Sequence, residues 1–570
     1  MRINFTDIKT SLIVKRYIIT ILCLLSIATT ANSQFSISKT PLMGWASWNN
    51  FGVKITESII KEQADRMILS GLAKAGYKFI NIDDGFFNGR YADGTLCIDS
   101  IKFPHGMKAL ADYIHSKGLK AGIYSEAGSY TCGSVYNGQA GGVGAGMYNH
   151  DQQDMDLFLK TWGYDFLKVD FCSGKEQLLD EKTRYSEIKT AINNTGRTDI
   201  SYNVCRWQFP GPWVTTLANS WRISEDISAS WNSIMSVIDK NTFLAPFASQ
   251  GHYNDMDMLE VGRGMTTEED KSHFSMWCML SSPLVLGNNL ANITPQTIDI
   301  LTNAEVIAVN QDTTGLQAHL VSDNRYGLQV WAKHLNGKQS REIAVVLFNR
   351  SAVASNISVK WRDLNLTGTV SIRDLWMHRN LESLDSMFTT LVPSHGVVML
   401  KVIGTQTILQ EVFEAEYAWI NNFNLTQNGA TVEGQGSVVR DTICSGGAKV
   451  SFLGNSQDNY IEFRDIFTNN PGSYHLKIFY LCGENRSAGI SINGKDTVLT
   501  DLNSGSSNTI SNYTFPIKLI KGYNTIRISN ATARLPDIDK IQLNLNQVVK
   551  PFLKFKIIRE IQKLLKPKKT

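Results

Sequence analysis

The sequence predicts a multidomain protein in which a (β/α)8 TIM barrel is followed by two antiparallel β-sandwiches. A chain of 570 residues has room for about three or four domains of ordinary size. In residues 34–315, short apolar runs alternate with longer amphipathic segments, which is typical of a parallel sheet with crossover helices. From residue 316 onward only short alternating runs remain, with turn residues between them, and this pattern favours antiparallel sheets.

Residues 1–33 are predicted to be a secretory signal peptide. Lys15 and Arg16 precede an apolar run over residues 18–28, which is short for a bilayer span. The small residues of Ala31–Ser33 then provide a cleavage site. An uncleaved N-terminal anchor is the alternative. Cleavage would leave a mature chain with no membrane span, in the periplasm or outside the cell.

Eight segments between residues 34 and 315 are predicted to be the barrel strands, and helical patterns such as Glu57–Ala75 and Met107–Ser116 lie between them. Polar and acidic residues collect at the carboxyl ends of these strands, which is the face where barrel enzymes carry their chemistry. The predicted strands are Met43–Trp45, Phe79–Asp84, Lys120–Tyr124, Phe166–Asp170, Ile200–Val204, Trp221–Ser224, Tyr253–Asp255 and Pro283–Gly287.

The remainder of the chain is predicted to form the two sandwiches and a tail. Residues 316–403 make the first sandwich, and Gly404–Thr407 reads as a short break. Residues 408–547 make the second, a jelly roll in which Asn493-Gly494 is a strong hairpin signal. Residues 548–570 are basic, and both a solvated tail and a membrane-surface helix fit them.

Charge and cysteine content exclude some function classes. The net charge of +4 is too small to indicate a nucleic-acid partner. Of the eight cysteines, Cys23 lies in the signal segment, and the other seven form no CxxC pair, so a zinc site has little support. Because seven is odd, at least one thiol stays free, although export permits disulfides.

Asp170 is the first candidate for reaction chemistry, because it ends a buried apolar strand. Lys168 lies two residues earlier, so strand geometry puts both side chains on the same side. A cation beside a carboxylate favours the ionised form, which suits a nucleophile. A structural ion pair at the barrel mouth is the alternative. Glycoside hydrolysis with retention would need a second carboxyl group about 5–5.5 Å away.

Further acids lie at other strand ends. Asp226 follows a later strand, and spacing alone does not separate it from Glu225 as a proton donor. Asp83 and Asp84 point in opposite directions if strand geometry persists, whereas a turn could bring both toward sugar hydroxyl groups. Asp257 ends another strand. One such acid could be a helix cap or an ion pair, but five at strand ends favour a carbohydrate site.

Seven segments resemble glycoside hydrolase family 27, the α-galactosidase and α-N-acetylgalactosaminidase group. The resemblance spans roughly residues 36–403, and it is specific because the segments follow the family order. The segments are Thr40–Trp45 with Trp48, Ile82–Gly85, Gly122–Ser125, Tyr164–Asp170 with Cys172, Trp221–Asp226, Asn254–Leu259 and Val309–Asp312.

The resemblance implies a role for each carboxyl group of the pair. Asp170 matches the nucleophile and Asp226 the acid/base, which decides against Glu225. Cys132 and Cys172 match a disulfide beside the nucleophile. Because carboxyl groups perform both steps, the resemblance implies no cofactor for catalysis.

The resemblance also implies which residues bind the sugar. Trp48 matches an aromatic wall, and Asp83 and Asp84 match the pair that holds O4 and O6 of galactose. The residues implied to contact the substrate are Trp48, Asp83, Asp84, Tyr124, Lys168, Arg206, Arg222 and Asp257.

The loop Cys205–Phe209 departs from the family pattern. It matches the loop that reads the second position of the sugar, where galactosidases usually carry Glu after the cysteine and acetylgalactosaminidases carry small residues. Arg206 and Phe209 are both large, which argues against room for an acetamido group but matches neither pattern. A β-L-arabinopyranosidase is a further alternative, since that sugar is galactose without its hydroxymethyl group. Retention of both Asp83 and Asp84 favours galactose.

Residues 408–547 resemble carbohydrate-binding modules of families 6 and 35. The resemblance implies a structural calcium held by Glu414, Glu416 and Asp539, and hard oxygen ligands are what calcium takes. Ordinary surface acids are the alternative. The matching segments are Phe413–Glu416, Gly472–Tyr474 with Tyr480, Ile492–Gly494, Lys521–Ile526 and Pro536–Asp539.

Together these features predict an exported retaining exo-glycosidase that removes terminal α-D-galactosyl residues from oligosaccharides or polysaccharides by double displacement. The same mechanism on an α-N-acetylgalactosaminide or a β-L-arabinopyranoside is the alternative. A catalytically silent carbohydrate-binding surface protein is the alternative from another class, and it would require a damaged carboxylate pair.

Overall fold

The computed structural model describes residues 39–424 and 434–545. The predicted signal peptide and the basic tail lie outside these residues, so both stay predictions. Within the described part of the chain, no helix is long and apolar enough to cross a membrane.

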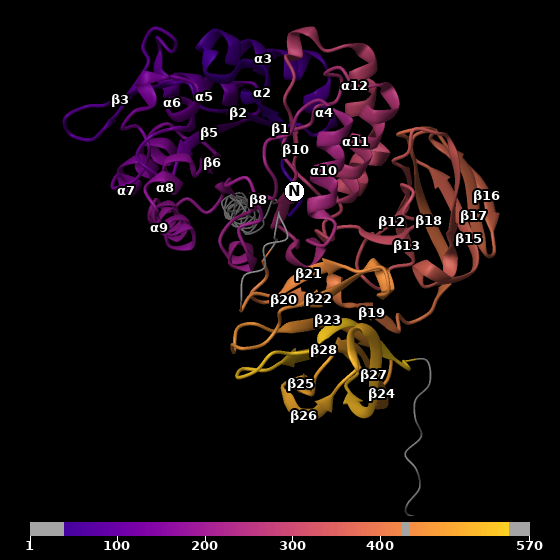
Figure 1. Ribbon diagram of the computed structural model, residues 1–570. Helices are drawn as coiled ribbons and strands as arrows, with labels where there is room; N and C mark the ends of the chain where they lie inside the picture. Colours follow the sequence, from indigo (N-terminus) through magenta and orange to yellow (C-terminus); the bar gives the residue numbers. More distant parts are fainter. Residues whose placement is uncertain (1–38, 425–433, 546–570) are drawn as a thin grey trace, which may run out of the picture. The chain divides into compact units, whose positions relative to one another are not determined.

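The first part of the chain forms a closed barrel of eight parallel strands, which confirms the predicted fold (Figure 1). The strands follow the order β10-β1-β2-β5-β6-β7-β8-β9, and a bridge between Leu259 and Leu286 closes the ring. Each of the eight predicted segments overlaps one of these strands. The strands are β1 (Met43–Ala46), β2 (Phe79–Ile82), β5 (Lys120–Glu126), β6 (Phe166–Asp170), β7 (Ser201–Val204), β8 (Ser220–Arg222), β9 (Tyr253–Asp255) and β10 (Leu284–Leu286).

Helices connect successive barrel strands. The helix expected over Glu57–Ala75 is divided, because Gly71 takes a left-handed conformation with φ 84° between two shorter helices. The helices are α2 (Trp48–Phe51), α3 (Glu57–Leu69), α4 (Leu72–Ala75), α5 (Gly106–Ser116), α6 (Cys132–Tyr136), α7 (Asp151–Met155), α8 (Cys172–Glu176), α9 (Glu181–Asn194), α10 (Trp231–Asn241), α11 (Thr267–Met279), α12 (Pro295–Leu301) and α13 (Ala304–Asn310).

A hairpin that the sequence analysis did not predict follows strand β2. It pairs β3 (Phe87–Arg90) with β4 (Leu96–Ile98). Arg90 anchors it, since its guanidinium group binds the buried Asp154 carboxylate with a nitrogen–oxygen distance of 2.5 Å. The hairpin therefore belongs to the loops at the carboxyl ends of the barrel strands.

The next eight strands form the predicted antiparallel sandwich. One sheet has the order β11-β12-β13-β18-β15-β16, and β14 pairs with β17. Strand β18 continues to Thr407, so Gly404–Thr407 extends a strand and is not the break that the sequence suggested. The strands are β11 (His319–Asp323), β12 (Leu328–His334), β13 (Glu342–Asn349), β14 (Ser355–Lys360), β15 (Leu366–Asp374), β16 (Arg379–Leu384), β17 (Met387–Val392) and β18 (Val397–Thr407).

The last described part is a second antiparallel sandwich of two sheets. Their orders are β21-β22-β29-β24-β27 and β20-β23-β28-β25-β26, with β19 also paired to β29. Asn493 and Gly494 both have positive φ and turn the chain between β25 and β26, as predicted. The strands are β19 (Val412–Glu414), β20 (Trp419–Ile420), β21 (Ser437–Arg440), β22 (Ala448–Ser451), β23 (Ile461–Thr468), β24 (Gly472–Cys482), β25 (Arg486–Ile492), β26 (Lys495–Leu502), β27 (Ser506–Leu519), β28 (Gly522–Ser529) and β29 (Asp537–Leu543).

Candidate active site

Asp170 ends strand β6 and is buried at the carboxyl end of the barrel. The expected position of Lys168 on the same side of the strand is confirmed, since its Nζ lies 3.6 Å from Asp170 Oδ1. The same ammonium group donates to Asp83 Oδ2 at 2.9 Å. One half-buried cation therefore joins the ends of strands β6 and β2.

Burial and charge set the protonation behaviour of this pair. Burial raises the pKa of Asp170 to about 7, and the Lys168 ammonium opposes this rise. Burial disfavours the charged form of Lys168, but the carboxylates of Asp170 and Asp83 keep the pKa of Lys168 well above its ordinary value. Lys168 is therefore a fixed positive charge, and it is the main group that opposes the burial-driven rise in the pKa of Asp170.

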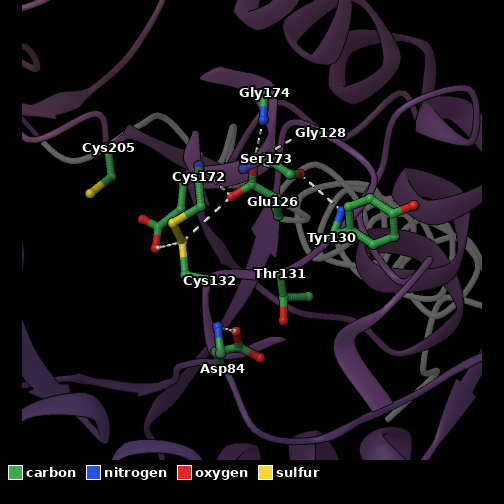
Figure 2. Close-up of a disulfide and its surroundings, with 12 residues drawn as sticks. Asp84, Glu126, Gly128, Tyr130, Thr131, Cys132, Cys172, Ser173, Gly174 and Cys205 are labelled. Carbon is green, nitrogen blue, oxygen red and sulfur yellow. Dashed lines mark hydrogen bonds between the residues drawn. A yellow bond between two sulfur atoms is a disulfide. The ribbon is translucent and has the colours of Figure 1, made fainter. Parts of the chain in front are cut away.

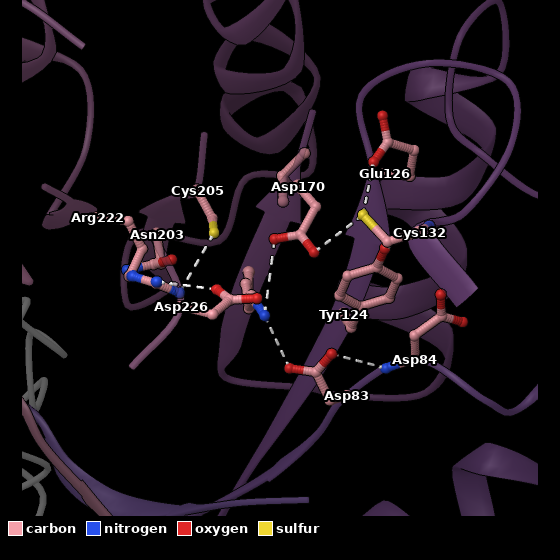
Figure 3. A network of polar contacts seen from close by, with 12 residues as sticks. Asp83, Asp84, Tyr124, Glu126, Cys132, Asp170, Asn203, Cys205, Arg222 and Asp226 are labelled. Atoms are coloured by element: carbon pink, nitrogen blue, oxygen red, sulfur yellow. Dashed lines mark hydrogen bonds and ion pairs between the residues drawn. The ribbon is translucent and has the colours of Figure 1, made fainter. Parts of the chain in front are cut away.

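Asp226 lies on the loop after strand β8, and its side chain is 58% exposed. Arg222 Nη2 lies 2.9 Å from Asp226 Oδ1 and 2.9 Å from Asp257 Oδ2. Glu225, the rival of Asp226, forms an ion pair with Lys240 instead. Figure 3 shows the carboxyl groups of Asp83, Asp170 and Asp226 pointing toward one another.

Arg222 lowers the pKa values of both acids that it contacts, Asp226 and Asp257. Burial acts to raise the pKa of Asp226, but Arg222 and Lys168 outweigh it, so the pKa of Asp226 lies below its ordinary value. Asp257 is fully buried, and burial raises its pKa to about 6 against the effect of Arg222. The free site therefore holds Asp226 as a carboxylate.

One pocket at this face collects several of the residues expected to bind a sugar. Asn203, which the sequence analysis did not select, also lines the pocket and donates to Asp255 at 2.9 Å. The expected residues that line the pocket are Asp83, Tyr124, Lys168, Arg222 and Asp257.

Three other expected contacts have different surroundings. Asp84 is fully buried, and its Oδ1 and Oδ2 accept hydrogen bonds from the N–H groups of Gly85 and Gly133, each at 2.7 Å. Arg206 forms an ion pair with Glu181 of helix α9 at 2.7 Å. Trp48 begins helix α2 and is half-buried. Contacts of these three residues with a sugar stay predictions.

The expected disulfide between Cys132 and Cys172 is present (Figure 2). Cys132 Sγ lies 3.3 Å from Asp170 Oδ2, so the bridge packs directly against the nucleophile candidate. The other described cysteines are free, as the odd count required of at least one. They are Cys97, Cys205, Cys278, Cys444 and Cys482.

Two functional candidates beside Asp170 were missed by sequence reasoning. Cys205 follows strand β7, and its thiol lies 3.8 Å from Arg222 Nη1. Glu126 ends strand β5 and is fully buried. The signal for both was their place at a strand end, a criterion that had been applied to other acids, Glu225 among them, but to neither of these residues.

The expected calcium ligands meet at one place in the second sandwich. Ser445 links two of them, since its hydroxyl group donates to Glu414 at 2.6 Å and its N–H donates to Asp539 at 2.8 Å. Among the described residues, Glu416 has no hydrogen-bond partner for either carboxylate oxygen, and Glu414 Oε2 also has none. Burial, followed by the charge of Glu414, raises the pKa of Glu416 to about 9. The three unpartnered oxygens are hard ligands of the kind that a divalent cation takes, and a metal site here stays a prediction.

Comparisons with known proteins agree with this geometry. The family described as Alpha galactosidase A matches residues 40–312, and the Alpha galactosidase C-terminal beta sandwich domain matches residues 326–402. Alpha-galactosidase 2 of Arabidopsis thaliana is 40% identical over 369 residues, which are 64% of this chain and 89% of the relative. Alpha-galactosidase A of Cellvibrio japonicus is 37% identical over 403 residues, which are 66% of this chain and 96% of the relative.

A solved structure also resembles this chain in fold and sequence. The crystal structure of alpha-galactosidase I from Mortierella vinacea superposes with a TM-score of 0.61 and 35% identity, covering 66% of this chain and all of that one. The curated relatives match most of their own length. The barrel strands, their strand-end acids and most of the first sandwich fall within the residues that the two family matches cover. The chain therefore belongs to the α-galactosidase family, glycoside hydrolase family 27.

Proposed function

We propose that this protein is a retaining exo-α-galactosidase in which Asp170 is the nucleophile and Asp226 the general acid/base. The observation that carries the proposal is that each of the two carboxyl groups contacts a cation of the same pocket. Lys168 and Arg222 both line that pocket, and Lys168 contacts Asp170 while Arg222 contacts Asp226. Curated α-galactosidases match this chain over most of their own length, and this similarity supports the choice of sugar.

The first step forms a covalent intermediate. Asp170 attacks the anomeric carbon of the α-galactoside from the β face, while Asp226 donates a proton to the departing glycosidic oxygen. In the second step, Asp226 removes a proton from water, and the water oxygen attacks the same carbon from the α face. The Asp170 carboxylate leaves, and galactose is released with its α configuration retained.

Proton donation requires Asp226 to gain a proton that the free site disfavours. A bound sugar would cover the exposed Asp226 side chain and so raise its pKa through desolvation. Arg222 would keep Asp257 as its buried partner while its contact with Asp226 weakens. Neutralisation of Asp170 as a glycosyl ester would lower the pKa of Asp226 again, which suits its second role as a base.

Azide rescue of two variants tests the assignment. With an aryl α-galactoside, Asp170→Gly removes the nucleophile, so azide should attack from the β face and yield β-galactosyl azide. Asp226→Gly keeps the glycosyl-enzyme, so azide should attack it from the α face and yield α-galactosyl azide. Each variant without azide should lose roughly 10³-fold or more in kcat, since the losses include general acid–base catalysis of about 10²–10⁴-fold.

Glu225→Gln is the matched control, because Glu225 is adjacent but paired with Lys240. It should keep wild-type turnover and need no azide. Azide products of the opposite configuration would refute the assignment of the two roles. Faster wild-type release from a β-L-arabinopyranoside or an α-N-acetylgalactosaminide than from the α-galactoside would refute the choice of sugar. Sugar binding without hydrolysis of any of the three would favour the non-enzymatic alternative.

We also propose that residues 408–547 form a carbohydrate-binding module with a structural calcium ion. Glu414, Glu416 and Asp539 would hold the ion, whose charge would neutralise the buried Glu416 and Asp539 and the half-buried Glu414. Gly446 makes room for this arrangement: a β-carbon on it would lie 2.1 Å from Glu416 Oε1. Export to the periplasm or the exterior, where polysaccharide substrates are found, completes the proposal.

A further inference from the structure

Glu126 is a buried acid at the chemistry end of the barrel that the mechanism above does not use. It ends strand β5, and the strand register places it directly beside Asp170 at the end of β6. Its side chain is fully buried. A buried carboxyl group beside a carboxylate nucleophile is unfavourable unless it has strong hydrogen-bond partners.

The partners of Glu126 come chiefly from the turn that follows the nucleophile (Figure 2). Its Oε2 accepts from the N–H of Cys172 at 2.9 Å. Its Oε1 accepts from the N–H groups of Ser173 at 3.1 Å and Gly174 at 3.2 Å. The N–H of Gly128 also donates to Oε1, at 3.0 Å. Four backbone donors therefore meet one carboxyl group, and three of them belong to consecutive residues.

The disulfide separates Glu126 from the reacting atoms. Cys132 Sγ lies 3.6 Å from Glu126 Oε2 on one side and 3.3 Å from Asp170 Oδ2 on the other. Glu126 therefore acts on Asp170 through the backbone at Cys172, two residues along the chain, and through the bridge from Cys172 to Cys132. It has no direct route to a sugar in the pocket.

We infer that Glu126 is a positioning residue that holds the nucleophile in its attack geometry. Its carboxyl group fixes the N–H groups of residues 172–174, and these fix both the carboxyl end of strand β6 and the disulfide beside Asp170. A buried N–H group that loses its acceptor is costly, so four donors on one carboxyl group hold this turn firmly. The inference rests on the proposed role of Asp170 as nucleophile.

Glu126→Gln tests the inference, because the amide keeps the side-chain shape but places an NH₂ group against backbone donors. We expect kcat for an aryl α-galactoside to fall by about 10- to 100-fold, since misplacing a reacting group by 1 Å costs up to about 10²-fold. The inhibition constant of free galactose should stay near the wild-type value, because Asp83, Lys168 and Arg222 are untouched. Glu126→Asp, which keeps a carboxyl group as the acceptor, should recover part of the loss.

Asp154→Asn is the matched control, because Asp154 is equally buried but is paired with Arg90 of the hairpin. It should lower thermal stability while each titrated active site keeps wild-type kcat. The inference is wrong if Glu126→Gln also keeps wild-type kcat per titrated site, or weakens galactose inhibition as strongly as it lowers kcat. If the Gln variant does not fold, Glu126→Asp is judged by the same criterion. Ser173→Ala is judged in the same way, because it removes a hydroxyl group that also donates to Glu126 Oε1, at 3.4 Å. A wild-type enzyme inert toward α-galactosides would instead refute the proposed function.

Discussion

Single charged residues govern the chemistry of the pocket. Lys168 contacts both Asp83 and Asp170, so one side chain connects an expected sugar-binding acid with the nucleophile candidate. Arg222 contacts both Asp226 and Asp257, so it connects the acid/base candidate with another expected sugar-binding acid. The sequence revealed the Lys168–Asp170 pair because strand geometry fixes residues two apart on one side. It could not reveal the Arg222–Asp257 pair, because that contact joins strand β8 to the segment after its neighbour β9, and spacing rules act only within one element.

Replacing Lys168 by methionine should shift the pH dependence of catalysis. The Lys168 ammonium lowers the pKa of Asp170, which burial has raised to about 7, so removing the charge should raise that pKa further. Because the nucleophile must be ionised, the acidic limb of kcat/KM should move to higher pH. Lys120→Met is the control, since Lys120 begins strand β5 at the opposite end of the barrel. An acidic limb that stays in place, or moves to lower pH, would contradict this account.

Among the larger elements, the barrel strands were the most predictable. Each is a short apolar run that neighbouring strands and helices bury, and the acids at the strand ends marked the chemistry face. The hairpin of β3 and β4 was not predictable, because its polar residues are held by Arg90 and the distant Asp154 and not by a core of its own. Gly71 divides the predicted helix Glu57–Ala75 in two. The sequence did not show this division, because the apolar periodicity continues across Gly71 and carries no information about its φ angle.

Gly44 in strand β1 should tolerate no side chain. It lies opposite Phe79 of β2, and a β-carbon would be 2.6 Å from the carbonyl oxygen of Phe79. The backbone of Phe79 cannot rotate away, so we expect Gly44→Ala to lower the free energy of unfolding. Overpacking typically costs about 1–3 kcal/mol, and the loss here should be no smaller. Gly118→Ala is the control, because its β-carbon meets open space and only its positive φ is strained. Equal losses of melting temperature in the two variants would contradict the close approach of β1 and β2.

At the scale of the whole molecule, the family matches cover the first two domains and leave out the second sandwich. The two family matches end at residue 402, so the barrel and the first sandwich correspond to the α-galactosidases. The second sandwich lies beyond them and carries the cluster of Glu414, Glu416 and Asp539. The sequence identified this cluster only through resemblance, because no spacing rule joins acids from β19, the turn after it and β29. Its function should therefore separate from catalysis.

Calcium should stabilise the full-length protein without being needed for hydrolysis of a small substrate. Binding an ion at 100 times its dissociation constant contributes about 2.7 kcal/mol to the folded state, so calcium should raise a thermal unfolding transition and a chelator should lower it. Glu416→Gln should abolish this difference, because both oxygens of Glu416 lack hydrogen-bond partners among the described residues. Glu484→Gln is the control, since Glu484 is exposed and paired with Arg486, and it should keep the calcium response. Turnover of an aryl α-galactoside should be the same with calcium and with chelator. An unfolding temperature that does not change with calcium would refute the proposed calcium site. A loss of turnover in chelator would show that the ion also stabilises the barrel.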